Sequence, residues 1–233
     1  MKQNGSGAEA GGKRSGFTRI ELAGVLGVAG VLAAGVLPVA AQGGLFDVFG
    51  RARENARRAS CQSNLKQISL GLLQYSTDYD EMMPLAASTG KGLDTRSSTA
   101  YGWADALYPY LKSKLLFVCP SERHTNAEQF SSKGFSDYWL NRNVARKGLA
   151  VFPAPAQTLT MGDGDGGSAA STARYSITAL APLWKETPRS PARRHLEGAN
   201  YAFLDGHVKW IVPARISTAS LAKAGDSPTF ATK

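Results

Sequence analysis

The sequence predicts an α+β fold, in which a long N-terminal helix, its first part in a membrane, packs by its second part against a small antiparallel β-sheet. Three observations lead to this prediction. Residues 22–41 are apolar and uncharged, residues 51–79 carry apolar side chains at helical spacing, and two strand-like runs near the C-terminus flank an Asp-Gly pair. The 233 residues, 43% of them hydrophobic, suffice for one domain with a core in addition to the helix.

Residues 22–41 have the length and composition of a membrane-spanning helix. Twenty residues at about 1.5 Å per residue give a helix of about 30 Å, the thickness of a bilayer's hydrocarbon core. Basic residues precede the run within residues 1–16 and favour a cytoplasmic N-terminus, with the rest of the chain exported. A conventional secretory signal has the same order of features. It would be cut after Val39-Ala40-Ala41 and would release a domain that begins near Gln42.

The Gly-Phe-Thr-Arg-Ile-Glu run at residues 16–21 resembles the type IV prepilin signature. The resemblance implies that a prepilin peptidase cuts after Gly16 and that Phe17 becomes a methylated N-terminus. It also implies that Glu21, the fifth residue of the mature chain, pairs with the N-terminal amine of a neighbouring subunit in a filament, which would compensate a carboxylate at the membrane edge. Without such a partner, Glu21 would lie at the level of the lipid headgroups. Arg19 departs from the family pattern, in which an apolar residue is usual.

Residues 51–79 carry strong helix signals, and the segment before them predicts a hinge. Leu65, Ile68 and Leu72 lie on one face of a helix and would form a core ridge beneath the sheet. The glycine pair at residues 43–44 and Gly50 flank a short apolar piece, which predicts an interruption of the helix there.

The chain is basic, with a formal net charge of +9. Basic side chains gather at the start of the second helical stretch, at Arg51, Arg53, Arg57 and Arg58. We interpret this cluster as a solvated or inter-subunit face of the helix, the alternative being a surface for DNA or anionic lipid. No helix-turn-helix, RNA-binding sheet or zinc pattern accompanies the charge. Nucleic acid is therefore not an expected partner.

Residues 57–76 and 78–81, together with Cys-Pro-Ser at residues 119–121, are similar to a large family of bacterial pseudopilin-like proteins. Those proteins couple a prepilin start to a C-terminal His-x9-Asp-Gly motif, which here is His195 with Asp205 and Gly206. Cys61 and Cys119 lie in the similar segments. We expect them to form a disulfide in an exported domain, the alternative being two buried free thiols. Two cysteines alone do not make a zinc site.

The remaining elements follow from local patterns. The predicted elements are a short amphipathic helix over residues 103–111, strands at 115–118 and 158–161, an aromatic segment across the sheet at 137–141, and a hairpin over 195–212. The composition of residues 86–100 predicts an exposed loop, and that of residues 213–233 a frayed tail.

Two places in the sequence could carry chemistry. Asp163 and Asp165 lie in a Gly-Asp run with the start of a calcium-loop spacing, but Arg174 stands where an EF-hand needs a carboxylate. Major pseudopilins of secretion systems bind calcium in a loop of the C-terminal domain, but this resemblance does not carry over to particular residues. We interpret the run as a Gly-Asp turn, the alternative being a calcium site at Asp163 and Asp165. His195 and Asp205 with His207 could form a metal or hydrolase site, but no separate nucleophile accompanies them. We interpret His195 as fixing the start of a strand and Asp205 as shaping the turn.

Taken together, the sequence predicts a structural pilin-like or pseudopilin subunit and not an enzyme. It would sit in a bacterial inner membrane as a single-pass protein with a periplasmic or extracellular domain, in a type II secretion or type IV pilus-like system. Its partners would be copies of itself or other pseudopilins, the prepilin peptidase, the inner-membrane assembly platform and the lipid bilayer. The alternative is an exported binding domain for DNA, polysaccharide or calcium. The predicted organisation is a leader (1–16), a transmembrane segment (17–41), a hinge with the soluble half of the helix (42–85), an exported domain (86–212) and a flexible tail (213–233).

Overall fold

The structure is a computed structural model that describes residues 18–41, 44–87, 101–122, 136–165, 174–221 and 227–232. Within helices, the side chains of residues 32–41 and 44–45 are not described. The chain divides into two compact units, Met1–Gly50 and Arg51–Lys233, and each is described by itself.

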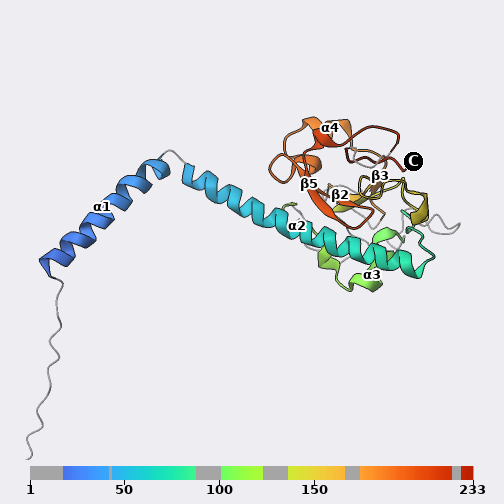
Figure 1. Cartoon of the computed structure of the whole chain (residues 1–233), viewed down its shortest axis with the longest axis horizontal. Coiled ribbons are helices and arrows are strands. Elements are labelled where there is room, and N and C mark those ends of the chain that lie inside the picture. Colours follow the sequence, from blue (N-terminus) through green and yellow to red (C-terminus); the bar gives the residue numbers. More distant parts are fainter. Residues whose placement is uncertain are drawn as a thin grey trace, which may run out of the picture. The chain divides into compact units, whose positions relative to one another are not determined.

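The described part of the first unit is helical. It contains α1, Arg19–Ala41, and the first turns of α2, Gly44–Asp78 (Figure 1). The sequence predicted a hinge over the glycine-flanked piece at residues 43–50. Helix α1 ends at Ala41 and α2 begins at Gly44, whereas Gly50 lies inside α2, where an added Cβ would meet no other atom within 4 Å. A solvent-facing glycine costs helix stability but does not end a helix whose neighbouring turns are well formed.

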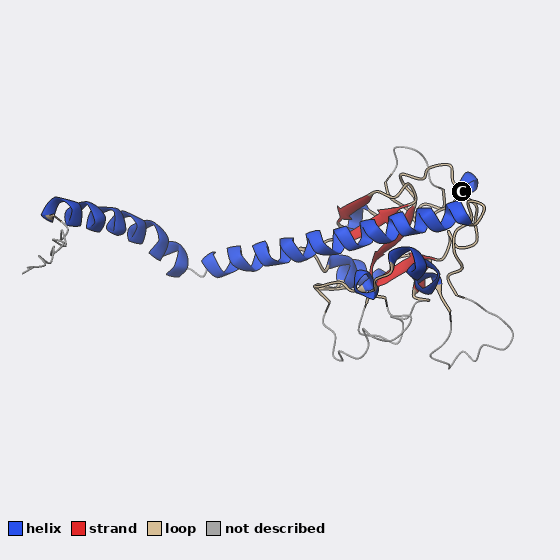
Figure 2. Cartoon of the chain, turned by 90° about the horizontal axis from the view of Figure 1, so that it is seen from below, coloured by secondary structure: helices blue, strands red, loops and turns tan. Residues whose placement is uncertain are grey.

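The second unit combines the long remainder of α2 with a five-stranded sheet of order β3-β1-β2-β4-β5 (Figure 1). Figure 2 shows the C-terminal part of α2 lying along this sheet. The strands are β1 Tyr138–Asn141, β2 Leu159–Asp163, β3 Ser176–Ile177, β4 Ala199–Phe203 and β5 Val208–Ile211. Pairs β1–β2, β2–β4 and β4–β5 are antiparallel, whereas β1 and β3 run parallel. The prediction of an α+β fold is confirmed. The prediction of an antiparallel sheet is wrong for one pair, because the edge strand β3 runs parallel to β1.

Side chains alternate along each strand, so each strand contributes residues to both faces of the sheet. A hydrophobic core covers each face. On one face, Leu140 and Ala202 belong to a core with the α2 residues Leu65 and Ile68, as the predicted core ridge requires. This core also includes residues of α3, Trp103–Leu111, whose bounds match the predicted helix. On the other face, the neighbouring residues Trp139, Leu159, Tyr201 and Phe203 form a second core with Ile216 and Phe230.

The second core corrects the prediction of a frayed tail. Phe230 is buried, and its ring lies 5.1 Å from that of Trp139, measured between centroids. The backbone adds hydrogen bonds from the Leu159 N–H to the Thr229 carbonyl and from the Thr229 N–H to the Gln157 carbonyl, each at 2.9 Å. The described residues 227–232 are therefore part of the domain. The composition of the segment did not indicate this, because a single aromatic residue, Phe230, holds the segment against the sheet.

The strand predicted at residues 115–118 is a 3₁₀ turn, Lys114–Phe117. A short apolar run does not distinguish a strand from a helical turn, and here Phe117 packs edge-on against Trp103 in the α2-side core. The remaining helical elements of the described residues are α4 Pro182–Glu186 and the 3₁₀ turns Leu149–Val151, Pro191–Arg193 and Pro213–Arg215.

Candidate functional site

The described N-terminal segment begins at Thr18, so Gly16 and Phe17 lie outside the described residues. Thr18 and Glu21 form a capping box at the start of α1. The Thr18 N–H donates to Glu21 Oε2 at 2.8 Å, and the Glu21 N–H donates to Thr18 Oγ1 at 3.3 Å. The Thr-x-x-Glu spacing is a recognisable signal for such a cap, which the sequence analysis did not use. Glu21 thus stabilises its own helix, whatever it contacts in an assembly.

The described side chains of α1 expose apolar surface on every side of the helix. The exposed fraction is 85% for Ile20 and 74% for Val31, and the other large apolar residues between them are also exposed, namely Leu22, Val25, Leu26 and Val28. Among the described residues, no helix is both long enough and apolar enough to cross a membrane.

The predicted disulfide is present between Cys61 on α2 and Cys119, which follows the 3₁₀ turn Lys114–Phe117. The two Cα atoms lie 5.4 Å apart, within the range that a disulfide spans. Both residues are fully buried in the core between α2 and the sheet. The disulfide therefore ties the helix to the domain that it supports.

His195 lies beside this disulfide and is fully buried. Its Nδ1 is 2.8 Å from Glu54 Oε1, and its Nε2 is 3.3 Å from Asp163 Oδ2 and 3.7 Å from Cys119 Sγ. Burial alone would lower the pKa of His195. The hydrogen bond and charge of Asp163, and then those of Glu54, outweigh burial and raise this pKa above its usual value. With a carboxylate at each ring nitrogen, the charged imidazole donates two hydrogen bonds.

His195 also fixes the start of β4, as predicted. Its backbone N–H donates to the Gly198 carbonyl at 2.8 Å, and its carbonyl accepts from the Trp210 indole N–H at 2.7 Å. An added Cβ at Gly198 would lie 2.5 Å from the Trp210 ring, so only glycine fits between this bend and β5.

Asp163 ends β2 with its carboxylate buried. Its Oδ2 accepts a hydrogen bond from the Asn200 N–H at 2.7 Å, whereas Oδ1 is buried and has no hydrogen-bond partner among the described residues. Asp163 shares a group of possible metal ligands with Cys61, Cys119 and His195, and this group does not include Asp165. Sulfur and imidazole donors do not suit calcium, so this arrangement gives the predicted calcium pair no support.

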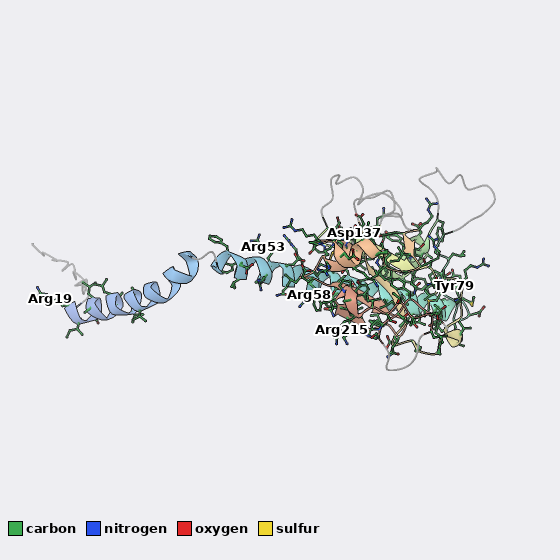
Figure 3. All side chains as sticks on the ribbon, turned by 90° about the horizontal axis from the view of Figure 1, so that it is seen from above. Arg19, Arg53, Arg58, Tyr79, Asp137 and Arg215 are labelled. Atoms are coloured by element: carbon green, nitrogen blue, oxygen red, sulfur yellow. A yellow bond between two sulfur atoms is a disulfide. The ribbon has the colours of Figure 1, made fainter. Side chains whose placement is uncertain are left out.

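A second polar group adjoins the first. Asp137, labelled in Figure 3, accepts a hydrogen bond from the Cys119 N–H at 2.7 Å. Burial raises the pKa of Asp137 to about 7, and the Cys119 N–H and the charge of Arg194 only partly oppose this rise. The buried Arg194 guanidinium pairs with Glu122 and donates to the Gly164 carbonyl. The hydrogen bond from the Cys119 N–H thus joins this second polar group to the disulfide.

The other members of the His-x9-Asp-Gly motif lie in the turn between β4 and β5. Asp205 Oδ1 accepts from the His207 N–H at 3.1 Å and lies 2.6 Å from His207 Nδ1. Gly206 has a φ of +85°, as the Asp-Gly turn predicted, and an added Cβ would lie 2.8 Å from Leu73 of α2. Asp205 and His207 are exposed and do not belong to the buried group of possible ligands, so the structure does not assemble the hydrolase site considered from the sequence.

Two of the clustered arginines on α2 make contacts within the second unit. The Arg58 guanidinium lies 5.5 Å from the centroid of the Trp210 ring, and Arg57 lies 3.5 Å from Glu54. Figure 3 labels Arg53 and Arg58 on α2. These contacts favour a structural role for part of the cluster.

Sequence reasoning missed Glu54, which lies on α2 and orients His195. No local pattern marks it, because its partner is 141 residues away along the chain. Sequence reasoning also assigned Asp163 and His195 to two different candidate sites. The short spacing between Asp163 and Asp165 suggested a calcium loop, whereas the structure places Asp163 beside His195.

Comparison with known proteins places most of this second unit in a family. Residues 50–173 match the family described as "Protein of unknown function (DUF1559)". No curated protein and no solved structure matches the sequence significantly. Because the family match covers more than half of the 233 residues, the chain belongs to the DUF1559 family.

Proposed function

We propose that the protein is a pilin-like structural subunit. A prepilin peptidase would cut it after Gly16 and Phe17 would be methylated. The helix over residues 17–41 would hold the chain in a bacterial inner membrane and then assemble it into a filament of a type II secretion or type IV pilus-like system. The observation that carries the proposal is a helix with apolar side chains exposed on every side, directly after a prepilin-like run.

A helix that is apolar all round is stable when lipid or other protein covers it. Successive residues of an α-helix are rotated by about 100°, so the large apolar side chains at positions 20, 22, 25, 26, 28 and 31 cover about two thirds of the circumference of α1. The small apolar residues Ala23, Gly27 and Gly30 lie on the remaining arc. Water is a poor environment for this surface, whereas a bilayer, or the core of a bundle of identical helices, covers it. The same surface thus supports both a membrane-held subunit and an assembled one.

Glycines support close packing between copies of α1. An added Cβ at Gly24, Gly27 or Gly30 would meet no atom within 4 Å in the isolated chain. These positions lie three residues apart and so form a loose stripe of small residues along the helix. Small residues let neighbouring helices approach closely in lipid, where packing, rather than exclusion of water, drives association.

The second unit supports the proposal through its architecture. The continuous helix α2 packs its apolar ridge against a small sheet, and the Cys61–Cys119 disulfide fastens it there. A subunit that assembles through α1 needs a folded domain elsewhere in the chain, and the second unit provides one. No catalytic constellation is required for this role.

The proposal is tested by producing the full chain in membranes together with a prepilin peptidase and measuring the intact mass and N-terminal sequence. We expect a chain that begins at methylated Phe17. The Gly16→Val variant should remain uncut, whereas Gly12→Val, in the same leader but away from the cleavage position, should be processed normally.

A chain that begins near Gln42 would contradict the proposal. It would indicate a conventional secretory signal and a released domain without Glu21. The protein would then be better explained as an exported binding domain, and retention on DNA or polysaccharide at low but not high salt would be the next measurement.

A further inference from the structure

Four buried side chains from four separate segments meet beside the disulfide. They are Cys61 on α2, Cys119 after the 3₁₀ turn, Asp163 at the end of β2 and His195 before β4. One ligand atom from each lies within 4.8 Å of the others, and each residue is at most 1% exposed. We call these four residues the buried ligand cluster.

The spacing of this cluster is close to that of a tetrahedral zinc site. Zinc binds sulfur at about 2.3 Å and nitrogen or oxygen at about 2.0–2.1 Å, so tetrahedral ligand atoms lie roughly 3.3–3.8 Å from one another. His195 Nε2 is 3.3 Å from Asp163 Oδ2 and 3.7 Å from Cys119 Sγ. Thiolate, imidazole and carboxylate are also the three ligand classes that zinc prefers. The two sulfurs, bonded to each other in the disulfide, must move apart to reach this spacing.

The surroundings hold the ligands in the orientation that a metal needs. Histidine ligands usually bond through one ring nitrogen to the metal and through the other to a carboxylate, which fixes the ring. Glu54 occupies that position, 2.8 Å from His195 Nδ1, and leaves Nε2 directed at Cys119 and Asp163. The Asn200 N–H likewise fixes Asp163 through Oδ2.

Asp163 provides a second, independent observation. Its Oδ1 is a buried carboxylate oxygen without a hydrogen-bond partner among the described residues. A buried acceptor without a partner is costly in a folded protein, and such atoms often mark an ion or water site. A cation bound at this carboxylate would give the oxygen a partner and remove the cost.

We propose that reduction of the Cys61–Cys119 disulfide converts the buried ligand cluster into a site for one Zn²⁺. A dithiol reductant transfers two electrons and two protons to the S–S bond, which breaks into two thiols while the dithiol becomes its own cyclic disulfide. Zn²⁺ then displaces both thiol protons and the Nε2 proton of the charged His195 ring; the three protons leave to solvent, and two Zn–S bonds form. His195 binds as neutral imidazole through Nε2, and Asp163 supplies the fourth ligand. The zinc ion replaces the disulfide as the connection between α2 and the sheet.

This inference does not depend on the pilin-like assignment. It gives the domain two alternative ties between the same two segments, a disulfide under oxidising conditions and a zinc ion under reducing ones. A domain that meets both conditions, in synthesis and after export, would keep α2 attached in each.

The test uses the untagged full chain in detergent, once oxidised and once reduced under anaerobic conditions. Each form is incubated with Zn²⁺, freed of unbound metal and measured for zinc by mass spectrometry. We expect one zinc per reduced chain and none per oxidised chain. Co²⁺ in place of zinc should give the intense visible bands of a tetrahedral site and sulfur-to-cobalt charge transfer. Equal zinc in both forms, or a cobalt spectrum without the sulfur band, would overturn the proposal.

Variants separate the site from adventitious binding. Asp163→Asn and Cys61→Ser should each lose the stoichiometric zinc, whereas His207→Asn, which removes an exposed imidazole outside the cluster, should keep it. Glu54→Gln should weaken zinc binding by about 10–100-fold, since carboxylates that orient a ligand histidine have effects of that size. Unchanged zinc affinity in both Asp163→Asn and Glu54→Gln would contradict the assignment. The comparison of reduced with oxidised wild type remains decisive if a variant fails to fold.

Discussion

Glu54 and His195 are 141 residues apart in sequence, yet Glu54 Oε1 lies 2.8 Å from His195 Nδ1. The contact joins α2 to the segment that begins β4, on the same side of the domain as the disulfide. His195 is buried, so its charge depends on this carboxylate and on Asp163. The contact therefore sets the protonation state of the polar centre of the domain.

Glu54→Gln should lower the pKa of His195 in the disulfide-bonded protein. The substitution removes one of the two carboxylates that raise this pKa, while burial, which lowers it, is unchanged. An NMR titration of the His195 ring resonances measures the change. Glu197→Gln is the matched control, because Glu197 is exposed and pairs with Arg193 instead. An unaltered His195 pKa in Glu54→Gln would show that Asp163 alone holds the proton.

Asp137 makes the domain less stable as the pH rises. Its pKa is about 7 in the folded protein and 3.8 ordinarily, so the folded state binds the proton more tightly than the unfolded state. This contribution to stability is fully present below pH 4 and is lost as the pH rises through about 7. The raised pKa of His195 acts with the same sign, its contribution being lost as the pH rises through its folded value.

Asp137→Asn isolates the aspartate because Asn retains an acceptor for the Cys119 N–H. Guanidinium unfolding of both proteins should show that wild type loses more stability between pH 4 and pH 8 than the variant does. The expected difference is on the order of 4 kcal/mol, from about 1.4 kcal/mol per pKa unit. Parallel pH profiles for the two proteins would refute this account.

The disulfide should stabilise the domain through loop closure. Cys61 and Cys119 are 58 positions apart, and closing a loop of this size contributes about 4 kcal/mol by chain entropy. The Cys61→Ser/Cys119→Ser protein, compared with oxidised wild type in the presence of a chelator, should lose stability of that order in denaturant unfolding. A loss well under about 1 kcal/mol would mean that residual structure already limits the freedom of the unfolded chain without the disulfide.

Phe230→Ala should destabilise the domain, because it empties a buried site against Trp139. Removing a buried phenylalanine side chain costs about 3–5 kcal/mol. Leu221→Ala is the control, since Leu221 is 52% exposed and should change stability by less than about 0.5 kcal/mol. Equal stabilities for the two variants would show that Phe230 does not stabilise the domain and that the C-terminal segment behaves as a frayed tail.

These cases separate what local sequence predicts from what it does not. The bounds of α3, the Asp205-Gly206 turn and the ridge of Leu65, Ile68 and Leu72 follow from spacings within one element. The partners of His195 do not, because Glu54 and Asp163 approach it only when α2, β2 and β4 pack together. Proximity in sequence also suggested a wrong partner, because it grouped Asp163 with Asp165 as calcium ligands, whereas the structure groups Asp163 with His195.

Glu21→Gln separates two roles of the carboxylate in the proposed filament. Glutamine preserves the capping box, because its side-chain oxygen still accepts from the Thr18 N–H. It removes the negative charge that would attract the amine of a neighbouring subunit. We expect Glu21→Gln to be processed after Gly16 and inserted normally but to form filaments at least tenfold less often than wild type by electron microscopy. Glu21→Ala, which loses both the cap and the charge, should assemble no better. Normal filaments from Glu21→Gln together with failure of Glu21→Ala would show that Glu21 acts by capping α1 and not by charge pairing between subunits.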